Sequence, residues 1–204
     1  MTAHRLDAVE LRVLGCLVEK QRTTPDQYPL SLNALRLACN QATNRDPVVE
    51  YDESQVRTAA QRLGQIGWAR LASGPGSRTA KYRHLFDEAL ALDSAETALL
   101  ALLFLRGPQT VAELKARSER LHRFADTDDV SAGLARLDVR ELAHLLSRLP
   151  GQREERWTLL VGEGTIDEPP AAAGETTSVE RRLQQVEERL AELERQLAER
   201  GLLD

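Results

Sequence analysis

The stretch DESQVRTAAQRLGQIGWARLASGPGSRTAKYR, residues 52–83, decides the fold. Its first half predicts a helix that begins at a cap, Asp52 or Ser54, and ends at Gly67. Its second half predicts a β-hairpin, because two strand-like runs flank a turn that holds glycines and a proline. The predicted buried stripe of the helix comprises Val56, Ala59, Ala60, Leu63 and Ile66, and the strand-like runs are residues 68–72 and 79–83.

Two more helices are predicted upstream of this stretch. Asp7 can cap the first, with Glu10 completing a capping box, and a loop through residues 23–29 ends it. Ser31 begins the second helix, and a polar loop through residues 44–47 follows it. Three helices followed by a hairpin is the element order of a winged helix-turn-helix domain, in which the hairpin is the wing.

The same element order is predicted again downstream. Ser94 is expected to cap a helix, Thr110 to begin a second and Asp126 to open a third. Two strand-like runs, residues 142–149 and 157–161, then flank a turn and form a second hairpin.

One of these strands has an alternative interpretation, because residues 141–148 also suit a helix. A strand is preferred because it completes a hairpin that matches the first one. The predicted fold class is therefore mainly α with small β-hairpins (α+β). It consists of two tandem winged helix-turn-helix domains, residues 1–86 and 87–163, followed by a C-terminal coiled-coil helix.

The C-terminal part of the chain differs in composition. Residues 164–177 are rich in Gly, Pro, Ala and Thr and are predicted to form a flexible linker. Residues 178–203 carry a heptad pattern that predicts a coiled coil and self-association into a homodimer. The alternative is an amphipathic helix that docks on its own chain. The predicted coiled-coil interface comprises Val179, Leu183, Val186, Leu190, Leu193 and Leu197.

Charge is distributed unevenly along the chain, whose net charge is −5. Residues 1–86 hold 12 basic and 8 acidic side chains, whereas residues 87–163 hold 10 basic and 14 acidic ones. If any part of the protein contacts a polyanion, we therefore expect it to be the first domain.

Several classes of function are not indicated. Cys16 and Cys39 lie in apolar helical surroundings and are predicted to be free buried thiols, and the four histidines lack metal-ligand spacing. No phosphate-binding glycine motif is present. The apolar run at residues 98–105 is too short to span a membrane, and the N-terminus does not resemble a signal peptide. We therefore expect a cytoplasmic protein that is not an enzyme and needs no metal or cofactor.

The polar face of the third predicted helix is the candidate DNA-binding surface. In a helix-turn-helix protein the recognition helix enters the major groove, and the wing of a winged helix contacts the backbone. Arg and Gln side chains can pair with base edges, and Thr can contact phosphate. The candidate residues are Gln55, Arg57, Thr58, Gln61, Arg62 and Gln65 on the helix, and Arg78 and Lys81 on the hairpin.

The second domain is a weaker candidate for DNA binding. Its third helix opens with Asp126, Asp128 and Asp129, whose carboxylates would repel phosphates. We expect this domain to pack against the first or to bind a protein partner.

The amide-rich segment after the second helix is another candidate recognition surface. It comprises Asn40, Gln41, Asn44 and Arg45, with Arg45 as the charged contact. The alternative is structural, because amide side chains at the end of a helix can satisfy backbone groups of the following loop.

Several segments of the chain resemble the bacterial YceH-like family. The resemblance covers roughly residues 6–163, and it implies a tandem winged-helix fold in a family whose biochemical role is unassigned. It implies no catalytic residues. The segments that carry it are LVEKQ (17–21), TTP (23–25), YPLS (28–31), ACNQ (38–41), NR (44–45), PV (47–48), LRG (105–107), QT (109–110), EL (113–114), Arg117, PG (150–151) and ER (155–156).

The sequence as a whole favours a DNA-binding protein of the kind that regulates transcription. Its first domain would bind double-stranded DNA, and its C-terminal helix would pair two protomers. The alternative is a protein–protein interaction scaffold built from tandem winged helices, with no nucleic-acid binding. The acidic second domain suits that alternative, because fold alone does not fix function.

Overall fold

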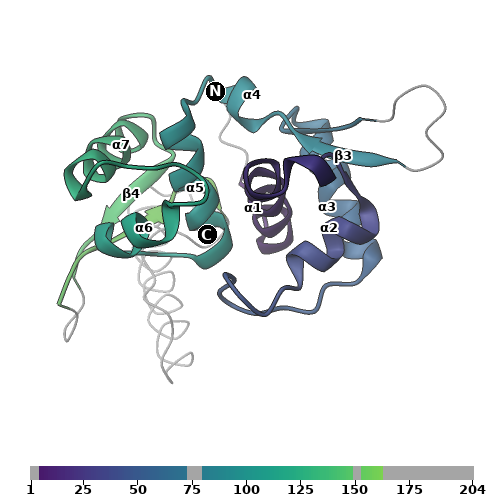
Figure 1. Cartoon of the computed structure of the whole chain (residues 1–204), viewed down its shortest axis with the longest axis horizontal. Helices are drawn as coiled ribbons and strands as arrows, with labels where there is room; N and C mark the ends of the chain where they lie inside the picture. Colours follow the sequence, from purple (N-terminus) through teal and green to yellow (C-terminus); the bar gives the residue numbers. More distant parts are fainter. Residues whose placement is uncertain (1–4, 73–79, 149–152, 163–204) are drawn as a thin grey trace, which may run out of the picture. The chain divides into compact units, whose positions relative to one another are not determined.

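The computed structural model describes residues 5–72, 80–148 and 153–162, all within one compact unit that spans residues 1–167 (Figure 1). The predicted linker and coiled-coil helix lie outside the described residues. Within the described part, no helix is long and apolar enough to cross a membrane. Helices and small antiparallel sheets make up the unit, which confirms the predicted α+β class.

The first half of the unit contains the three predicted helices and the predicted pair of strands. It also contains three elements that were not predicted, namely a 3-10 turn, a two-residue strand and a short helix. The elements are α1 (Ala8–Thr23), η1 (Pro25–Gln27), β1 (Leu30–Ser31), α2 (Leu32–Cys39), α3 (Glu53–Gln65), β2 (Ala69–Leu71), β3 (Lys81–His84) and α4 (Phe86–Leu90).

The short strand β1 turns the predicted hairpin into a three-stranded antiparallel sheet of order β1-β3-β2. Leu30 of β1 and Leu71 of β2 both pair with Tyr82 of the central strand β3. Two residues are too few to give the alternating pattern by which strands are recognised. Because β1 runs directly into α2, its pairing with Lys81 and Tyr82 connects the first half of β3 to the start of that helix.

The second half repeats the order of three helices and two strands. Its strand β4 pairs with β5 in an antiparallel register that places Ala143 opposite Leu159, so the strand interpretation of this segment is confirmed and the helix interpretation is wrong. The elements are α5 (Ser94–Arg106), α6 (Val111–Ser118), α7 (Thr127–Val139), β4 (Ala143–Leu146) and β5 (Arg156–Leu159).

The cap of α5 corrects one prediction, because the capping residue is Asp93 and not Ser94. The Asp93 carboxylate accepts the backbone N–H of Glu96 at 2.8 Å, and the Glu96 carboxylate accepts the backbone N–H of Asp93 at 3.1 Å. This reciprocal arrangement needs the glutamate three residues after the cap, and only Asp93 has that spacing. The same motif begins α1, α3 and α6.

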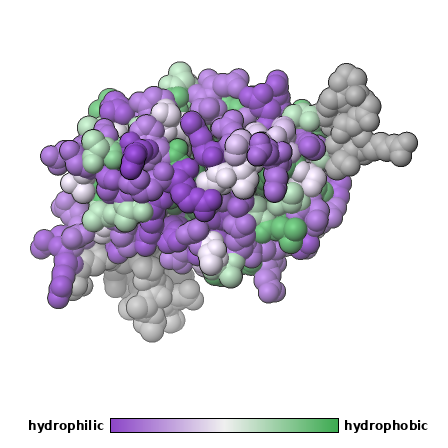
Figure 2. All heavy atoms as spheres, in the orientation of Figure 1, coloured by the Kyte–Doolittle hydropathy of each residue, from purple (hydrophilic) through white to green (hydrophobic). Residues whose placement is uncertain are grey.

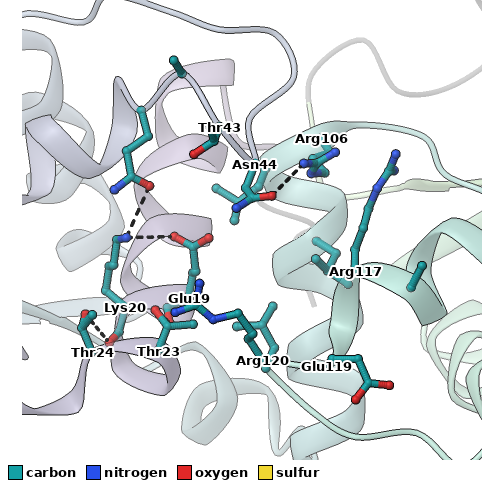
Figure 3. Close-up of a pocket in the computed structure, with 16 residues that line it drawn as sticks. Glu19, Lys20, Thr23, Thr24, Thr43, Asn44, Arg106, Arg117, Glu119 and Arg120 are labelled. Atoms are coloured by element: carbon teal, nitrogen blue, oxygen red, sulfur yellow. Dashed lines mark hydrogen bonds and ion pairs between the residues drawn. The ribbon is translucent and has the colours of Figure 1, made fainter.

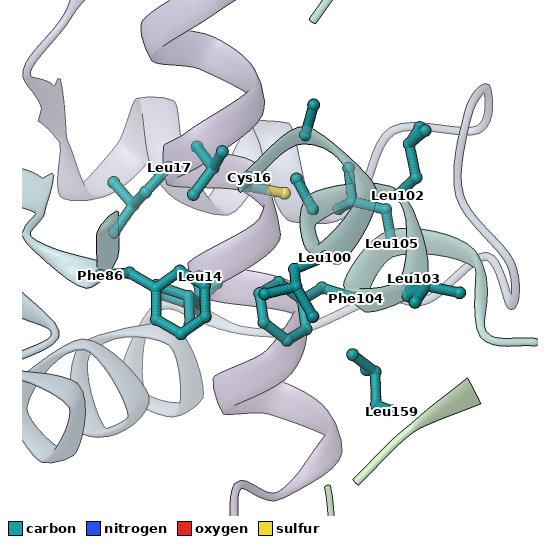
Figure 4. Packing of buried hydrophobic residues seen from close by; sticks show 14 of the residues in the cluster. Leu14, Cys16, Leu17, Phe86, Leu100, Leu102, Leu103, Phe104, Leu105 and Leu159 are labelled. Carbon is teal, nitrogen blue, oxygen red and sulfur yellow. The ribbon is translucent and has the colours of Figure 1, made fainter. Parts of the chain in front are cut away.

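Helix α1 lies at the centre of the unit and packs against both α3 and α5. Its side chains Leu14 and Leu17 are fully buried in the hydrophobic core, part of which Figure 4 shows. At Gly15 the two helices are in close contact, since an added Cβ would lie 2.9 Å from Cδ2 of Leu105 and 2.9 Å from Cβ of Phe104. The glycine therefore permits the close approach of α1 and α5.

A chain of aromatic rings joins the hairpin to α5. Trp68, next to β2, makes an edge-to-face contact with Phe86 of α4 at a centroid distance of 5.0 Å. Phe86 makes a similar contact with Phe104 of α5 at 5.4 Å. Such pairs stabilise a fold by about 0.5–1.5 kcal/mol beyond the burial of their area. The short helix α4 is thus a packed link between the sheet and the second half.

His84, the last residue of β3, connects the sheet to α1 and α4. Its side chain is fully buried, and its Nε2 lies 2.8 Å from Oε1 of Gln21 on α1. Its Nδ1 lies 3.3 Å from Oδ1 of Asp87. The backbone N–H of His84 donates to the Tyr28 hydroxyl at 2.8 Å. Burial lowers the pKa of His84 below its ordinary value of 6.5, although the Asp87 carboxylate opposes the shift.

Substitution of Gly15 by alanine should reduce stability because its new methyl group would overlap α5. Overpacking of this kind costs about 1–3 kcal/mol in the free energy of unfolding. Gly64, on α3, is the matched control, because its added Cβ would lie 3.7 Å from the nearest atom outside its helix, the Ala69 oxygen. Gly64→Ala should raise stability by about 0.5–1 kcal/mol, since alanine is the better helix former. Urea denaturation of both variants measures the difference, and equal stabilities would contradict the close contact.

The buried His84 should make the protein less stable in mildly acidic solution. Because its folded-state pKa lies below its unfolded-state pKa, the unfolded chain takes up the proton first as pH falls. This contribution to stability is therefore present above about pH 6.5 and is lost as pH falls towards the folded-state pKa. His84→Gln should flatten the dependence measured by urea denaturation between about pH 7.5 and 5.5. The parent protein, measured over the same range, is the control, and an equal dependence in His84→Gln would contradict the effect of burial on this side chain.

Candidate nucleic-acid interface

The outer face of α3 presents all six of the polar side chains that the sequence singles out. Each of them is exposed. The opposite stripe is buried at Val56, Ala59, Ala60 and Leu63, and Ile66 is half-buried just after the helix ends. The predicted orientation of this helix is therefore confirmed. The exposed residues are Gln55, Arg57, Thr58, Gln61, Arg62 and Gln65.

Both arginines of this face already have acidic partners. Arg57 Nη2 lies 2.5 Å from Oε1 of Glu53 one turn earlier on α3. Arg62 Nη1 lies 3.2 Å from Oδ2 of Asp7 and 3.9 Å from Oε1 of Glu10, at the start of α1. The charge of the face is therefore close to balanced.

These ion pairs are weak because they are exposed. The side chains of Arg57 and Glu53 are 51% and 53% exposed, and the side chain of Arg62 is 58% exposed. A pair that is exposed on both sides, such as Arg57 and Glu53, contributes about 0–1 kcal/mol. The partners of Arg62 are less exposed, at 34% for Asp7 and 9% for Glu10, so an external anion would compete with these carboxylates for the guanidinium.

The amide and hydroxyl groups of the face differ in how free they are. Gln55 is committed to the start of α3, where its Oε1 accepts the backbone N–H of Asp52 at 2.9 Å. Thr58, Gln61 and Gln65 make no side-chain hydrogen bond to any described residue. Of the polar residues without charge, these three are the ones free to contact base edges or phosphates.

The sheet that packs against α3 through β2 also carries exposed basic residues. Lys81, at the start of β3, is exposed, and so is Arg70 in the middle of β2. Arg83 is the cross-strand partner of Arg70 and forms an ion pair with Glu88 at 2.7 Å. Arg78 lies outside the described residues, so its proposed contact stays a prediction. Figure 2 shows that hydrophilic side chains cover most of one face of the molecule, with apolar ones in separate patches.

The amide-rich segment is held by hydrogen bonds within the protein. Arg45 is buried, and its two Nη atoms lie 3.0 and 2.6 Å from the carboxylate oxygens of Glu19 on α1. Its Nε donates to the Ala38 carbonyl at 3.1 Å, and Nη2 also donates to Oε1 of Gln41 at 3.1 Å. Hydrogen bonding to Glu19 raises the pKa of Arg45, against the opposing effect of burial. The buried guanidinium of Arg45 therefore connects the end of α2 to α1 by hydrogen bonds.

Asn40 joins the end of α2 to the start of α3. Its Nδ2 donates to the carbonyl of Tyr51 at 2.8 Å, and its Oδ1 accepts the backbone N–H of the same residue at 2.9 Å. Arg12 of α1, also buried, donates to the carbonyls of Cys39 and Pro47 at 3.0 and 2.7 Å. These contacts match the structural interpretation of the segment. The recognition role of its exposed part stays a prediction, and of the four residues Asn44 is the exposed one.

The remaining candidate groups are separate from this face. Asp126, Asp128 and Asp129 are exposed at the start of α7, as expected for an acidic surface. Cys16 and Cys39 are free and buried, as predicted. Within the described residues, no three His, Cys, Asp or Glu side chains are grouped in a way that could hold a metal ion.

Comparison with known proteins identifies relatives along most of the chain. Residues 6–152 match the family model described as "Protein of unknown function, DUF480". A UPF0502 protein of Dechloromonas aromatica (strain RCB) is 47% identical over 86% of this chain and 84% of its own length. UPF0502 proteins of Stenotrophomonas maltophilia (strain K279a) and Citrifermentans bemidjiense are each 52% identical, over 78% and 80% of this chain and 72% and 77% of their own lengths. These matches confirm the family resemblance seen in the sequence.

The buried pair of Arg45 and Glu19 should be far more strongly coupled than the exposed pair of Arg57 and Glu53. Arg45→Met alone leaves a carboxylate that is only 13% exposed without its main partner, which typically costs about 3–5 kcal/mol in the free energy of unfolding. A double-mutant cycle with Glu19→Gln, followed by urea denaturation, measures the coupling. The matched cycle, Arg57→Met with Glu53→Gln, should give a coupling below about 0.5 kcal/mol. Equal couplings in the two cycles would contradict the structural role of Arg45.

Proposed function

The chain belongs to the DUF480 family of bacterial proteins, and we propose that it binds double-stranded DNA through α3 and the adjacent sheet. The observation that supports this most directly is the row of exposed Arg, Gln and Thr side chains on α3, above a buried apolar stripe. A helix of 13 residues with such a face suits the major groove, which admits an α-helix and offers donors and acceptors to Arg and Gln.

The arrangement around α3 suits a winged helix. Helices α2 and α3 pack against each other and against α1, and β2 and β3 follow as an antiparallel pair. In this interpretation α3 is the recognition helix and residues 69–84 form the wing. Lys81 and Arg78 would then contact the phosphate backbone beside the groove.

The second half has a different role in this proposal. Its acidic helix start would repel DNA, so we assign it to packing against the first half or to a protein partner. We further propose that residues 178–203 pair two protomers through a coiled coil, which would double the number of phosphate contacts. A dimer of this kind is typical of proteins that regulate transcription.

Removing the two arginines of α3 should abolish most of the DNA binding. Each phosphate contact contributes about 0.9 to the slope of log affinity against log salt concentration. The double variant Arg57→Ala with Arg62→Ala should therefore lower that slope by about 1.8 per protomer. Fluorescence anisotropy with a mixed-sequence duplex, repeated over a salt series, measures both the affinity and the slope.

The matched control removes two exposed arginines from the second half, Arg123→Ala with Arg153→Ala. This variant loses the same charge and should keep the affinity and slope of the parent protein. Equal losses in both variants would show that net charge, and not α3, governs the binding. If the unaltered protein does not bind DNA at low salt, the DNA-binding proposal is wrong and a protein-interaction scaffold becomes the better explanation.

A further inference from the structure

A pocket of about 570 Å³ lies at the end of α1 away from the Asp7 cap (Figure 3). The last turns of α1 and α5, the loop at residues 41–44, and α6 with the residues just after it form its walls. The volume is within the range of about 300–1,000 Å³ that is typical of small-molecule sites. The DNA-binding proposal does not use this pocket.

Basic groups outnumber acidic groups in the pocket. Four cationic side chains line it, namely Lys20, Arg106, Arg117 and Arg120, against the carboxylates of Glu19 and Glu119. In Figure 3 the side chain of Arg120 extends towards Glu19, whereas the Glu119 carboxylate points away from the other labelled groups.

Both carboxylates of the pocket are already neutralised by other cations. Glu19 forms the bidentate pair with the buried Arg45. Glu119 lies 2.9 Å from Nζ of Lys115 and 3.7 Å from Nε of Arg123. Lys20 also pairs with Glu19, at 3.6 Å, and Arg117 pairs with Glu113 at 3.4 Å, so the uncompensated charge of the pocket lies on Arg106 and Arg120.

Two arginines of the pocket have no carboxylate partner among the described residues. Arg106 makes one side-chain hydrogen bond, from Nη2 to Oδ1 of Asn44 at 3.0 Å, and Arg120 makes none. Burial and the positive charge of Arg117 lower the pKa of Arg106. The repulsion between Arg106 and Arg117 is relieved when an anion binds next to Arg106.

The rest of the lining limits the kind of anion. Asn44 and Thr43 add polar groups next to the arginines, while Leu102, Leu105 and Leu121 supply an apolar wall. No aromatic side chain lines the described pocket, so it offers no aromatic ring on which a nucleobase could stack.

We propose that this pocket binds a small phosphate-bearing molecule with a compact aliphatic body. Arg106 binds the phosphate beside Asn44, because guanidinium groups donate in the planar geometry that phosphate oxygens accept. Arg120, which extends to the Glu19 side of the pocket in Figure 3, adds positive charge. Lys20 supplies a further positive charge, and the leucines contact the carbon skeleton. A phosphate is favoured over a carboxylate because its two charges match two unpaired arginines better than one charge does.

The test is a titration of the full chain, followed by ¹H–¹⁵N NMR spectra that include the arginine Nε–H signals. The probes are glycerol 3-phosphate, inorganic phosphate and butyrate. The expected result is saturable binding of glycerol 3-phosphate, with shifts confined to Arg106, Arg120 and the amides of residues 41–44. Butyrate should bind at least tenfold more weakly. Tighter binding of butyrate, or shifts that spread over the surface without saturation, would overturn the proposal.

Three variants separate the pocket from general attraction of anions. Arg106→Gln and Arg120→Gln should each raise the dissociation constant for glycerol 3-phosphate at least tenfold. Arg70→Gln removes an exposed arginine from β2, far along the chain from the pocket residues, and should leave that constant unchanged. The dispersion of each NMR spectrum shows whether the variant is folded. Equal weakening in all three variants, with folded spectra, would rule out the site.

Discussion

The close contact of α1 with α5 at Gly15 is the constraint on which the rest of the structure depends. A backbone approach that excludes even a methyl group makes the two halves share one core, because α1 also packs against α3. Leucines of α1 and α5 fill that core, and the aromatic chain from Trp68 to Phe104 joins it to the sheet. The position of α3, and hence of its polar face, follows from its packing on the same central helix.

Local signals in the sequence were enough to predict most of the regular structure. The cap at Asp7, the start of a helix at Thr110 and the buried stripe of α3 are predicted correctly, because capping and helical periodicity depend on residues only a few positions apart. The two-residue strand β1 and the five-residue helix α4 were missed, because neither is long enough to show a period. Their positions are fixed by tertiary pairing with β3 and by the ring of Phe86.

The candidate sites differ in how well they could be predicted from the sequence. The face of α3 could be predicted because it lies on one helix. The basic pocket could not, because its charged residues are separated by about a hundred positions, from Lys20 to Arg120, and come together only through the packing of α1 on α5. The segment around Arg45 could be recognised from the sequence by its high content of amide side chains. Its amide and guanidinium groups form hydrogen bonds with one another and with the backbone at the end of α2.

The burial of Arg45 also limits how this sequence can change over evolutionary time. Its guanidinium has donors directed at Glu19, Gln41 and the backbone of residues 38 and 44, so no shorter side chain can take over all of these contacts. A mutation of either charged partner alone leaves the other buried without compensation. Divergence at this point therefore requires two changes that arrive together, or a stabilising change elsewhere that comes first. The Arg45–Glu19 pair therefore restricts substitution at both positions for reasons of folding stability, independently of any ligand that the protein binds.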